Sequence, residues 1–172
     1  MLSRDTVLAL VAVLAFGKVQ AQEGPDLGVE ASAEEVAAWD ISISPDGTGL
    51  PAGSGTASEG ANIYAVQCLA CHGAEGGGQP NDRLAGGHGS LDQVAPLKTV
   101  GSYWPFATTV FDYIRRAMPY LQPQSLTNDE AYALTAYILF LNGIVEENET
   151  IDAHTLPEVQ MPNQESFILT YP

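Results

Sequence analysis

Basic side chains are scarce in this 172-residue chain, which carries six Lys and Arg against 21 Asp and Glu. The formal net charge of −15 excludes nucleic acid as a partner, because phosphate backbones are bound by proteins that bring an excess of positive charge. A basic protein partner would instead be attracted to this surface. The length suggests one domain with additional tails.

Cysteine and histidine are also rare, with two and three copies respectively. Three of these five residues stand together as Cys68-Leu69-Ala70-Cys71-His72, and only His88 and His154 remain. A zinc site would need further Cys or His at ligand spacing. A thioredoxin-like redox pair would need a βαβ context, which the sequence lacks. A plain disulfide between the two cysteines remains an alternative.

The Cys-x-x-Cys-His spacing predicts covalent attachment of one c-type haem. Two thiols one helical turn apart can each form a thioether with a haem vinyl group, which fixes the porphyrin edge to the backbone. The imidazole of His72 then reaches the iron from one side. We therefore expect Cys68 and Cys71 to bind the cofactor and His72 to be an axial iron ligand.

The longest uninterrupted hydrophobic run lies at the N-terminus, and no other stretch is apolar enough to cross a membrane. Arg4 precedes an apolar stretch over residues 7–16, and Val19-Gln20-Ala21 resembles a cleavage site, so residues 1–21 are predicted to be a secretory signal peptide. The run is too short to cross a bilayer, although an uncleaved anchor is an alternative. Cleavage would leave four basic and twenty acidic residues, a formal net charge of −16, on a soluble exported protein. In a bacterium, that places the protein in the periplasm.

Hydrophobic spacing and capping residues predict a mostly α fold with no persistent strand pattern. A helix is expected to begin at Thr56, within a capping box, and to end at the Cys68 motif. A second is expected over residues 107–117, with Val110, Phe111 and Ile114 on its apolar face. A third follows the capping box at residues 127–130 and stops at Gly143. We expect an irregular arm at residues 22–55 with a short helix near 31–39, a domain over 56–143 and an irregular tail at 144–172.

The sixth iron position has several candidate ligands. Methionine thioethers favour Fe(II) and are common in electron-transfer cytochromes. Met118 lies on a Pro-stiffened loop between the second and third predicted helices and is preferred, with Met161 in the tail as the alternative. His88 and His154 are better explained as surface residues. An iron left open or bound to water would point to catalysis on a small molecule instead.

Aromatic and basic residues are candidates for the edge of the cofactor. Trp104 and Tyr103 could donate a hydrogen bond to a propionate, and Arg83 could pair with one. Trp104 could equally be a packing residue. Arg115 and Arg116 could pair with propionates or with acids such as Asp112, or complement a helix dipole.

This arrangement resembles a class I cytochrome c, with a helix ending in Cys-x-x-Cys-His and a Met-Pro loop before a final helix. The resemblance implies that Gly60 and Tyr64 cross Ala136-Tyr137 on the last helix. One departure concerns the loop after the motif, where the family places a Pro whose carbonyl orients the His ligand. This chain has Asp82-Arg83-Leu84 there instead, which leaves the partner of His72 open.

A narrower resemblance spans roughly residues 39–167. It is carried by Pro45-Asp46-Gly47-Thr48-Gly49-Leu50-Pro51, Thr99-Val100-Gly101-Ser102-Tyr103-Trp104-Pro105, Phe111-Asp112-Tyr113-Ile114-Arg115-Arg116-Ala117-Met118-Pro119 and Met161-Pro162-Asn163. These segments resemble the cytochrome subunit of the Sox-type periplasmic sulfur dehydrogenase, a family that includes sulfite dehydrogenase cytochrome subunits. Larger members carry a second haem domain, so this chain resembles their first.

The resemblance implies a periplasmic monohaem cytochrome that accepts electrons from a molybdenum-cofactor sulfur/sulfite dehydrogenase subunit during thiosulfate or sulfur oxidation. It would pass them to a downstream cytochrome c and would not itself be the catalyst. Two alternatives remain open. The chain could be a free electron carrier without a permanent partner, or a haem enzyme with an open iron site.

Overall fold

The computed structural model describes residues 28–168 and Thr170. The predicted signal peptide lies outside the described residues. The described residues fall into two units, residues 28–39 and residues 40–168 with Thr170. The predicted arm over residues 22–55 is thus divided between them, and its second half belongs to the larger unit.

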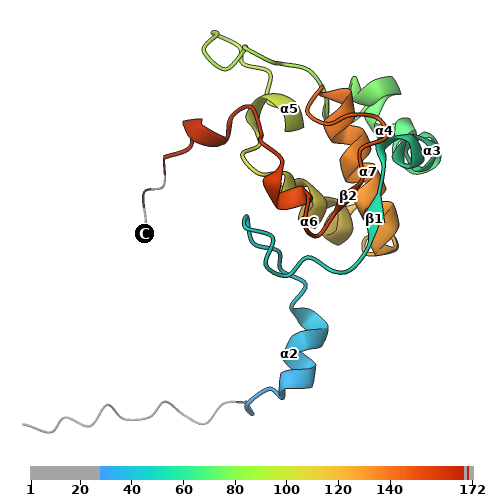
Figure 1. Cartoon of the computed structure of the whole chain (residues 1–172), viewed down its shortest axis with the longest axis vertical. Helices are drawn as coiled ribbons and strands as arrows, with labels where there is room; N and C mark the ends of the chain where they lie inside the picture. The colour runs from blue at the N-terminus through green and yellow to red at the C-terminus, as the bar shows by residue number, and fades with distance from the viewer. Residues whose placement is uncertain (1–27, 169, 171–172) are drawn as a thin grey trace, which may run out of the picture. The chain divides into compact units, whose positions relative to one another are not determined.

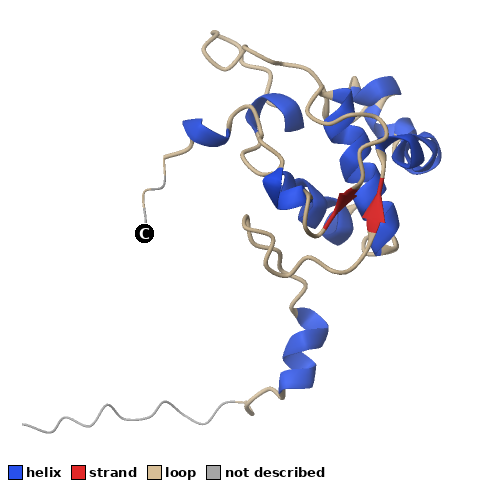
Figure 2. Cartoon of the chain, viewed as in Figure 1, coloured by secondary structure: helices blue, strands red, loops and turns tan. Residues whose placement is uncertain are grey.

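Six α-helices make the described part of the chain mostly helical, as predicted (Figure 2). The first unit contributes α2 (Ala33–Trp39). The second contributes α3 (Ala57–Gln67), α4 (Leu69–His72), α5 (Val100–Tyr103), α6 (Ala107–Ala117) and α7 (Asn128–Leu141). No helix over residues 28–168 is long and apolar enough to cross a membrane.

Capping boxes fix the N-termini of α3 and α7. The side chain of Thr56 accepts a hydrogen bond from the Glu59 amide while Glu59 binds back to the Thr56 amide. Thr127 and Glu130 repeat this arrangement. Each pair satisfies amide groups that would otherwise lack partners at a helix start. Both helices therefore begin where the sequence predicts.

Helix α7 is the centre of the larger unit and packs against both α3 and α6 (Figure 1). A side chain at Gly60 would meet the backbone carbonyl of Ala133, 2.6 Å from its carbon, and the Cβ of Tyr137 at 2.8 Å. The expected crossing of α3 with the last helix is therefore present, but Ala133 takes the place predicted for Ala136. The rings of Tyr64 and Tyr137 fill the crossing with centroids 5.2 Å apart.

The C-terminal tail is docked on this helical core. Strand β2 (Ile151–Asp152) pairs antiparallel with β1 (Ser54–Gly55), with Gly55 opposite Ile151. Two 3₁₀ turns follow, η2 (Leu156–Glu158) and η3 (Gln164–Ser166). Ile151, Leu156 and Met161 are buried. The tail thus pairs with the strand that precedes α3 and adds three buried side chains to the core.

Side chains of α6 and α7 hold the irregular residues before β1 against the core. The Tyr132 hydroxyl donates to the Pro51 carbonyl at 2.9 Å, and Thr108 Oγ1 donates to the Pro45 carbonyl at 3.1 Å. Arg116 donates to the Ile41 carbonyl at 3.2 Å. These bonds satisfy backbone groups that no regular element pairs.

Candidate functional site

A cavity of about 460 Å³ lies between the Cys68–His72 motif and α6 with its C-terminal cap Met118. Its size is within the ~300–1,000 Å³ usual for cofactor and ligand sites. Apolar side chains form much of its wall, among them Val100, Val110, Ile114, Leu126, Leu134 and Ile138. Leu134 and Ile138 come from α7, so the central helix supports the cavity directly.

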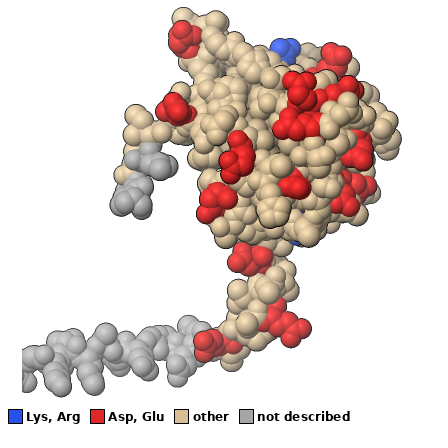
Figure 3. Space-filling view, viewed as in Figure 1, with Lys and Arg blue, Asp and Glu red and all other residues tan. Residues whose placement is uncertain are grey.

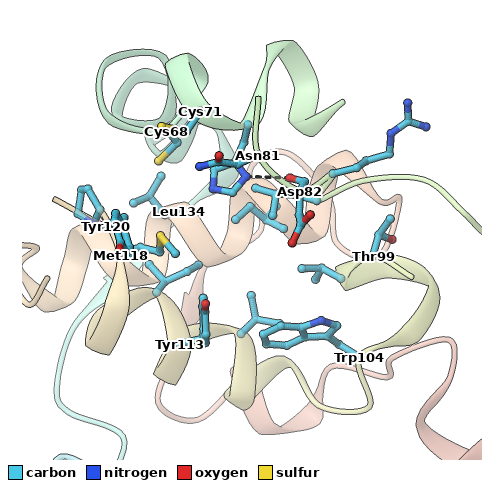
Figure 4. Close-up of a pocket in the computed structure, with 18 of the residues that line it drawn as sticks. Cys68, Cys71, Asn81, Asp82, Thr99, Trp104, Tyr113, Met118, Tyr120 and Leu134 are labelled. Atoms are coloured by element: carbon cyan, nitrogen blue, oxygen red, sulfur yellow. Dashed lines mark hydrogen bonds between the residues drawn. The ribbon is translucent and has the colours of Figure 1, made fainter. Parts of the chain in front are cut away.

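The two cysteines occupy one wall of this cavity (Figure 4). Cys68 ends α3 and begins α4, and the amides of Cys71 and His72 both donate to its carbonyl, at 3.1 and 2.9 Å. This single helical turn presents both thiols to the same space. Both cysteines are free, and burial raises the pKa of the Cys68 thiol to about 11.

The histidine of the motif is oriented by a backbone carbonyl. His72 Nδ1 lies 2.9 Å from the carbonyl oxygen of Asp82. A carbonyl can only accept, so Nδ1 carries the proton and Nε2 keeps its lone pair free for a metal. Asp82 therefore supplies the contact that the family usually takes from a Pro carbonyl.

Short hydrogen bonds fold the loop after the motif back onto it. The Gly78 amide donates to the His72 carbonyl at 2.7 Å, and the Asn81 amide donates to the Cys71 carbonyl at 2.9 Å. The Tyr64 hydroxyl, on α3, donates to the Gly73 carbonyl at 2.8 Å. Because the loop is tied to the motif at these points, Asp82 is held where it can meet the imidazole.

The facing wall carries Met118, Tyr113 and Trp104 (Figure 4). Met118 is the C-terminal cap of α6, and its amide donates to the Ile114 carbonyl. The rings of Trp104 and Tyr113 meet edge to face with centroids 5.7 Å apart. Met161 is not among the lining residues and is packed in the core with 4% exposure. Of the two candidate methionines, the structure therefore brings Met118 to the cavity.

These residues fit a covalently attached haem. The cavity offers apolar walls to a porphyrin, two free thiols on one side, an imidazole with a free nitrogen and a thioether sulfur. Across residues 28–168, no group of three or more His, Cys, Asp or Glu side chains could hold a metal ion by itself. The donor set suits an iron whose equatorial ligands come with the cofactor.

Known proteins share this architecture. Residues 55–138 match the family model described as cytochrome c oxidase, cbb3-type, subunit III. A chain in the crystal structure of the sulfane dehydrogenase SoxCD from Paracoccus pantotrophus is 44% identical, with a TM-score of 0.78, over 83% of this chain and 71% of that one. This chain belongs to the class I c-type cytochromes. Its cofactor is c-type haem, and Cys68 and Cys71 form the attachment motif.

A curated protein is also similar to this cytochrome. It is a thiosulfate dehydrogenase from Psychrobacter arcticus, 28% identical in an alignment 121 residues long that covers 64% of this cytochrome and 35% of that protein. The cytochrome thus spans about a third of this curated relative. The match says nothing of the rest of the relative's length.

Two cations line the cavity of the cytochrome, and sequence reasoning found only one. Arg83 was predicted, and its Nε donates to the Gly77 carbonyl at 2.9 Å. Lys98 also lines the cavity and lies just before α5. It was missed because a four-residue helix is too short to show a repeating pattern of apolar residues in the sequence. A haem propionate would find both at the cavity edge.

Other predicted residues lie elsewhere in the cytochrome. Tyr103 is not in the cavity lining, since its ring packs edge to face against Phe167 and lies under the Lys98 ammonium at 4.8 Å. Tyr103 was a candidate for the haem edge, and the structure places its ring outside the cavity lining. Arg116 pairs with Asp112 at 2.8 Å, which raises the pKa of the guanidinium. His88 and His154 are exposed and outside the cavity, and Arg115 is half-buried and also outside it.

Proposed function

We propose that this cytochrome is the monohaem electron-accepting subunit of a molybdenum-dependent sulfane dehydrogenase in the periplasm. It takes electrons one at a time from the subunit that oxidises the sulfur compound and passes them to a downstream cytochrome c. The 44% identity to a SoxCD chain over most of both chains supports the partner and the pathway. The acidic surface supports a basic docking partner.

The residues of the cytochrome bind, orient and tune the cofactor. When bound, c-type haem supplies the Fe(III)/Fe(II) couple, and the protein sets its potential through axial ligands and burial. His72 would hold the iron through Nε2, with its ring fixed by the Asp82 carbonyl. Met118 would hold it through its thioether sulfur, because its side chain lines the same cavity. Arg83, Lys98 and Trp104 are placed to contact propionates at the cavity edge.

The observation that carries this proposal is that His72 and Met118 both line one cavity. An iron held by both has no open position for a substrate, which favours electron relay over catalysis. The alternative of a haem enzyme with an open iron requires that Met118 stay unbound.

Two matched substitutions test the ligand. Met118→Leu removes the thioether from the cavity, whereas Met161→Leu makes the same chemical change in the buried core. Leu and Met have similar volumes, so both variants should fold. We expect Met118→Leu to abolish the low-spin Met–iron optical signature and lower the reduction potential, while Met161→Leu retains both. Retention of the signature in Met118→Leu would refute Met118 as the ligand.

Affinity purification of the tagged cytochrome from periplasm tests the complex. The expected result is a stoichiometric partner that contains molybdenum by metal analysis and reduces the cytochrome when given a sulfane substrate. A cytochrome that purifies alone and exchanges electrons only in collisions would favour the free-carrier alternative. The mass of the purified protein also tests whether residues 1–21 are removed on export.

A further inference from the structure

The short helix α2 has a defined start and two distinct faces. Ser32 and Glu35 form a capping box: the Ser32 amide donates to Glu35 Oε2 at 2.8 Å, and the Glu35 amide donates to Ser32 Oγ at 3.2 Å. These bonds lower the pKa of the Glu35 carboxyl. At helical spacing, Val36 and Trp39 fall on one side of the helix and Glu34 on the other. The sequence therefore encodes an amphipathic helix here.

The helix buries no side chain within its own unit. No residue of α2 is buried, and Val36 is 51% and Trp39 87% exposed. A seven-residue helix is marginal in water without packing, since isolated helices need roughly 12–15 residues. A short capped helix with an exposed indole has the features of a segment that is stabilised when its apolar side chains pack against another molecule.

The helix is also additional to the electron-carrying domain. The family model matches residues 55–138 and does not reach α2. The haem cavity takes no residue before Gln67. The matched region and the cavity lining therefore assign no role to this segment, to its capping box or to its tryptophan.

Charge indicates what kind of surface receives the helix. Residues 28–40 contain Glu30, Glu34, Glu35 and Asp40 and no Lys or Arg. The cytochrome itself is acidic, and acidic side chains dominate the face in Figure 3. A second copy would repel this segment, and so would an anionic membrane surface. A basic protein groove would attract it.

We propose that residues 28–40 are a docking segment that inserts Val36 and Trp39 into an apolar groove, rimmed by Lys and Arg, on the catalytic subunit of the complex. This rests on the proposed function, because it assumes that such a subunit binds the cytochrome.

The test measures binding of the molybdenum-containing subunit to the full exported holo-cytochrome and its variants. Trp39→Ala is expected to weaken the affinity by about tenfold or more, the usual effect of truncating a buried interface tryptophan. Glu34→Lys should weaken binding several-fold and flatten its dependence on salt. Val94→Ala is the control, because Val94 is fully exposed in a loop far along the chain and should stay within about twofold of wild type. The optical spectrum and reduction potential should be unchanged in all three.

Two results would overturn the proposal while the proposed complex stands. One is a Trp39→Ala variant that binds the molybdenum subunit within about twofold of wild type. The other is a cytochrome dimer, detected by analytical ultracentrifugation, that Trp39→Ala dissociates, because the helix would then be packed on a second copy. Failure to find any molybdenum-containing partner would instead remove the proposed function, and this proposal with it.

Discussion

Gly60 is predicted to be the position in α3 that least tolerates a side chain. In the Gly60→Ala variant, the new Cβ would lie 2.6 Å from the carbonyl carbon of Ala133 and 2.8 Å from Tyr137 Cβ. It would lie closer still to the carbonyl oxygen of Ala133. The obstructing atoms belong mainly to the backbone of α7, so no rotamer change can relieve the contact. The two helices would have to separate.

Two effects of opposite sign decide the magnitude. Replacing Gly by Ala within a helix favours folding by about 1 kcal/mol. Overpacking a close contact costs about 1–3 kcal/mol and more when backbone must shift. Because α3 and α7 form the most extensive helix contact of the unit, we expect the steric cost to exceed the propensity gain. The expected net loss is about 2 kcal/mol, or roughly 5–10 °C in melting temperature for a domain of this size.

Thermal unfolding of the holo-cytochrome, followed by circular dichroism, measures this loss. Ser58→Ala is the matched control: Ser58 lies half a turn earlier in α3, is exposed, and uses only its backbone amide to contact Glu147. Its stability should stay within about 0.5 kcal/mol of wild type. If Gly60→Ala melts at or above the wild-type temperature, the gain in helix propensity equals or exceeds the steric cost. The close crossing would then be wrong.

Three further substitutions probe other contacts. Tyr64→Phe loses the hydroxyl bond to the motif loop and should cost about 1 kcal/mol in denaturant unfolding at pH 7. Burial raises the pKa of the Tyr64 hydroxyl to about 12. The neutral hydroxyl therefore stabilises the fold fully below pH 10, and this contribution is lost as the pH rises through 12. Between pH 10 and 12, the free energy of unfolding should fall less in Tyr64→Phe than in the wild type. Asn142→Ala leaves the Gly86 amide unpaired and should cost about 1–3 kcal/mol, with faster hydrogen exchange at that amide. Asp152→Asn removes a carboxylate whose pKa is lowered by two backbone amides, so the wild-type advantage in melting temperature should be present above about pH 4 and vanish in stronger acid.

The elements that could be predicted from sequence are those encoded by short local signals. The capping boxes at Thr56 and Thr127 located the starts of α3 and α7. Three buried residues at helical spacing located α6, whose bounds match the prediction. The haem motif was recognisable because Cys and His are so rare in this chain that their clustering is informative. Each of these signals spans only a few residues, so no knowledge of the fold was needed.

The features that were missed depend on contacts between distant residues. Nothing in the sequence near Asp82 indicates that its carbonyl meets His72, because any residue supplies a carbonyl. The docking of the tail depends on the two-residue pairing between β1 and β2, which is too short to show alternation. Lys98 reaches the cavity only because Thr99 caps α5 and binds the Gly86 carbonyl at 2.6 Å. Such contacts depend on the tertiary fold, which patterns within a few consecutive residues do not specify.

Helix α7 explains why the fold and the haem site depend on each other. Ala133 and Tyr137 receive α3, whereas Leu134 and Ile138 line the cavity, so successive residues of one helix serve the crossing and the site. Asn142, just beyond its end, accepts from the Gly86 amide and donates to the Leu84 carbonyl, which fixes the loop that follows Asp82. A shift of α7 would therefore move Leu134 and Ile138 in the cavity wall together with the loop that orients His72. Both walls of the haem site take their positions from this one helix.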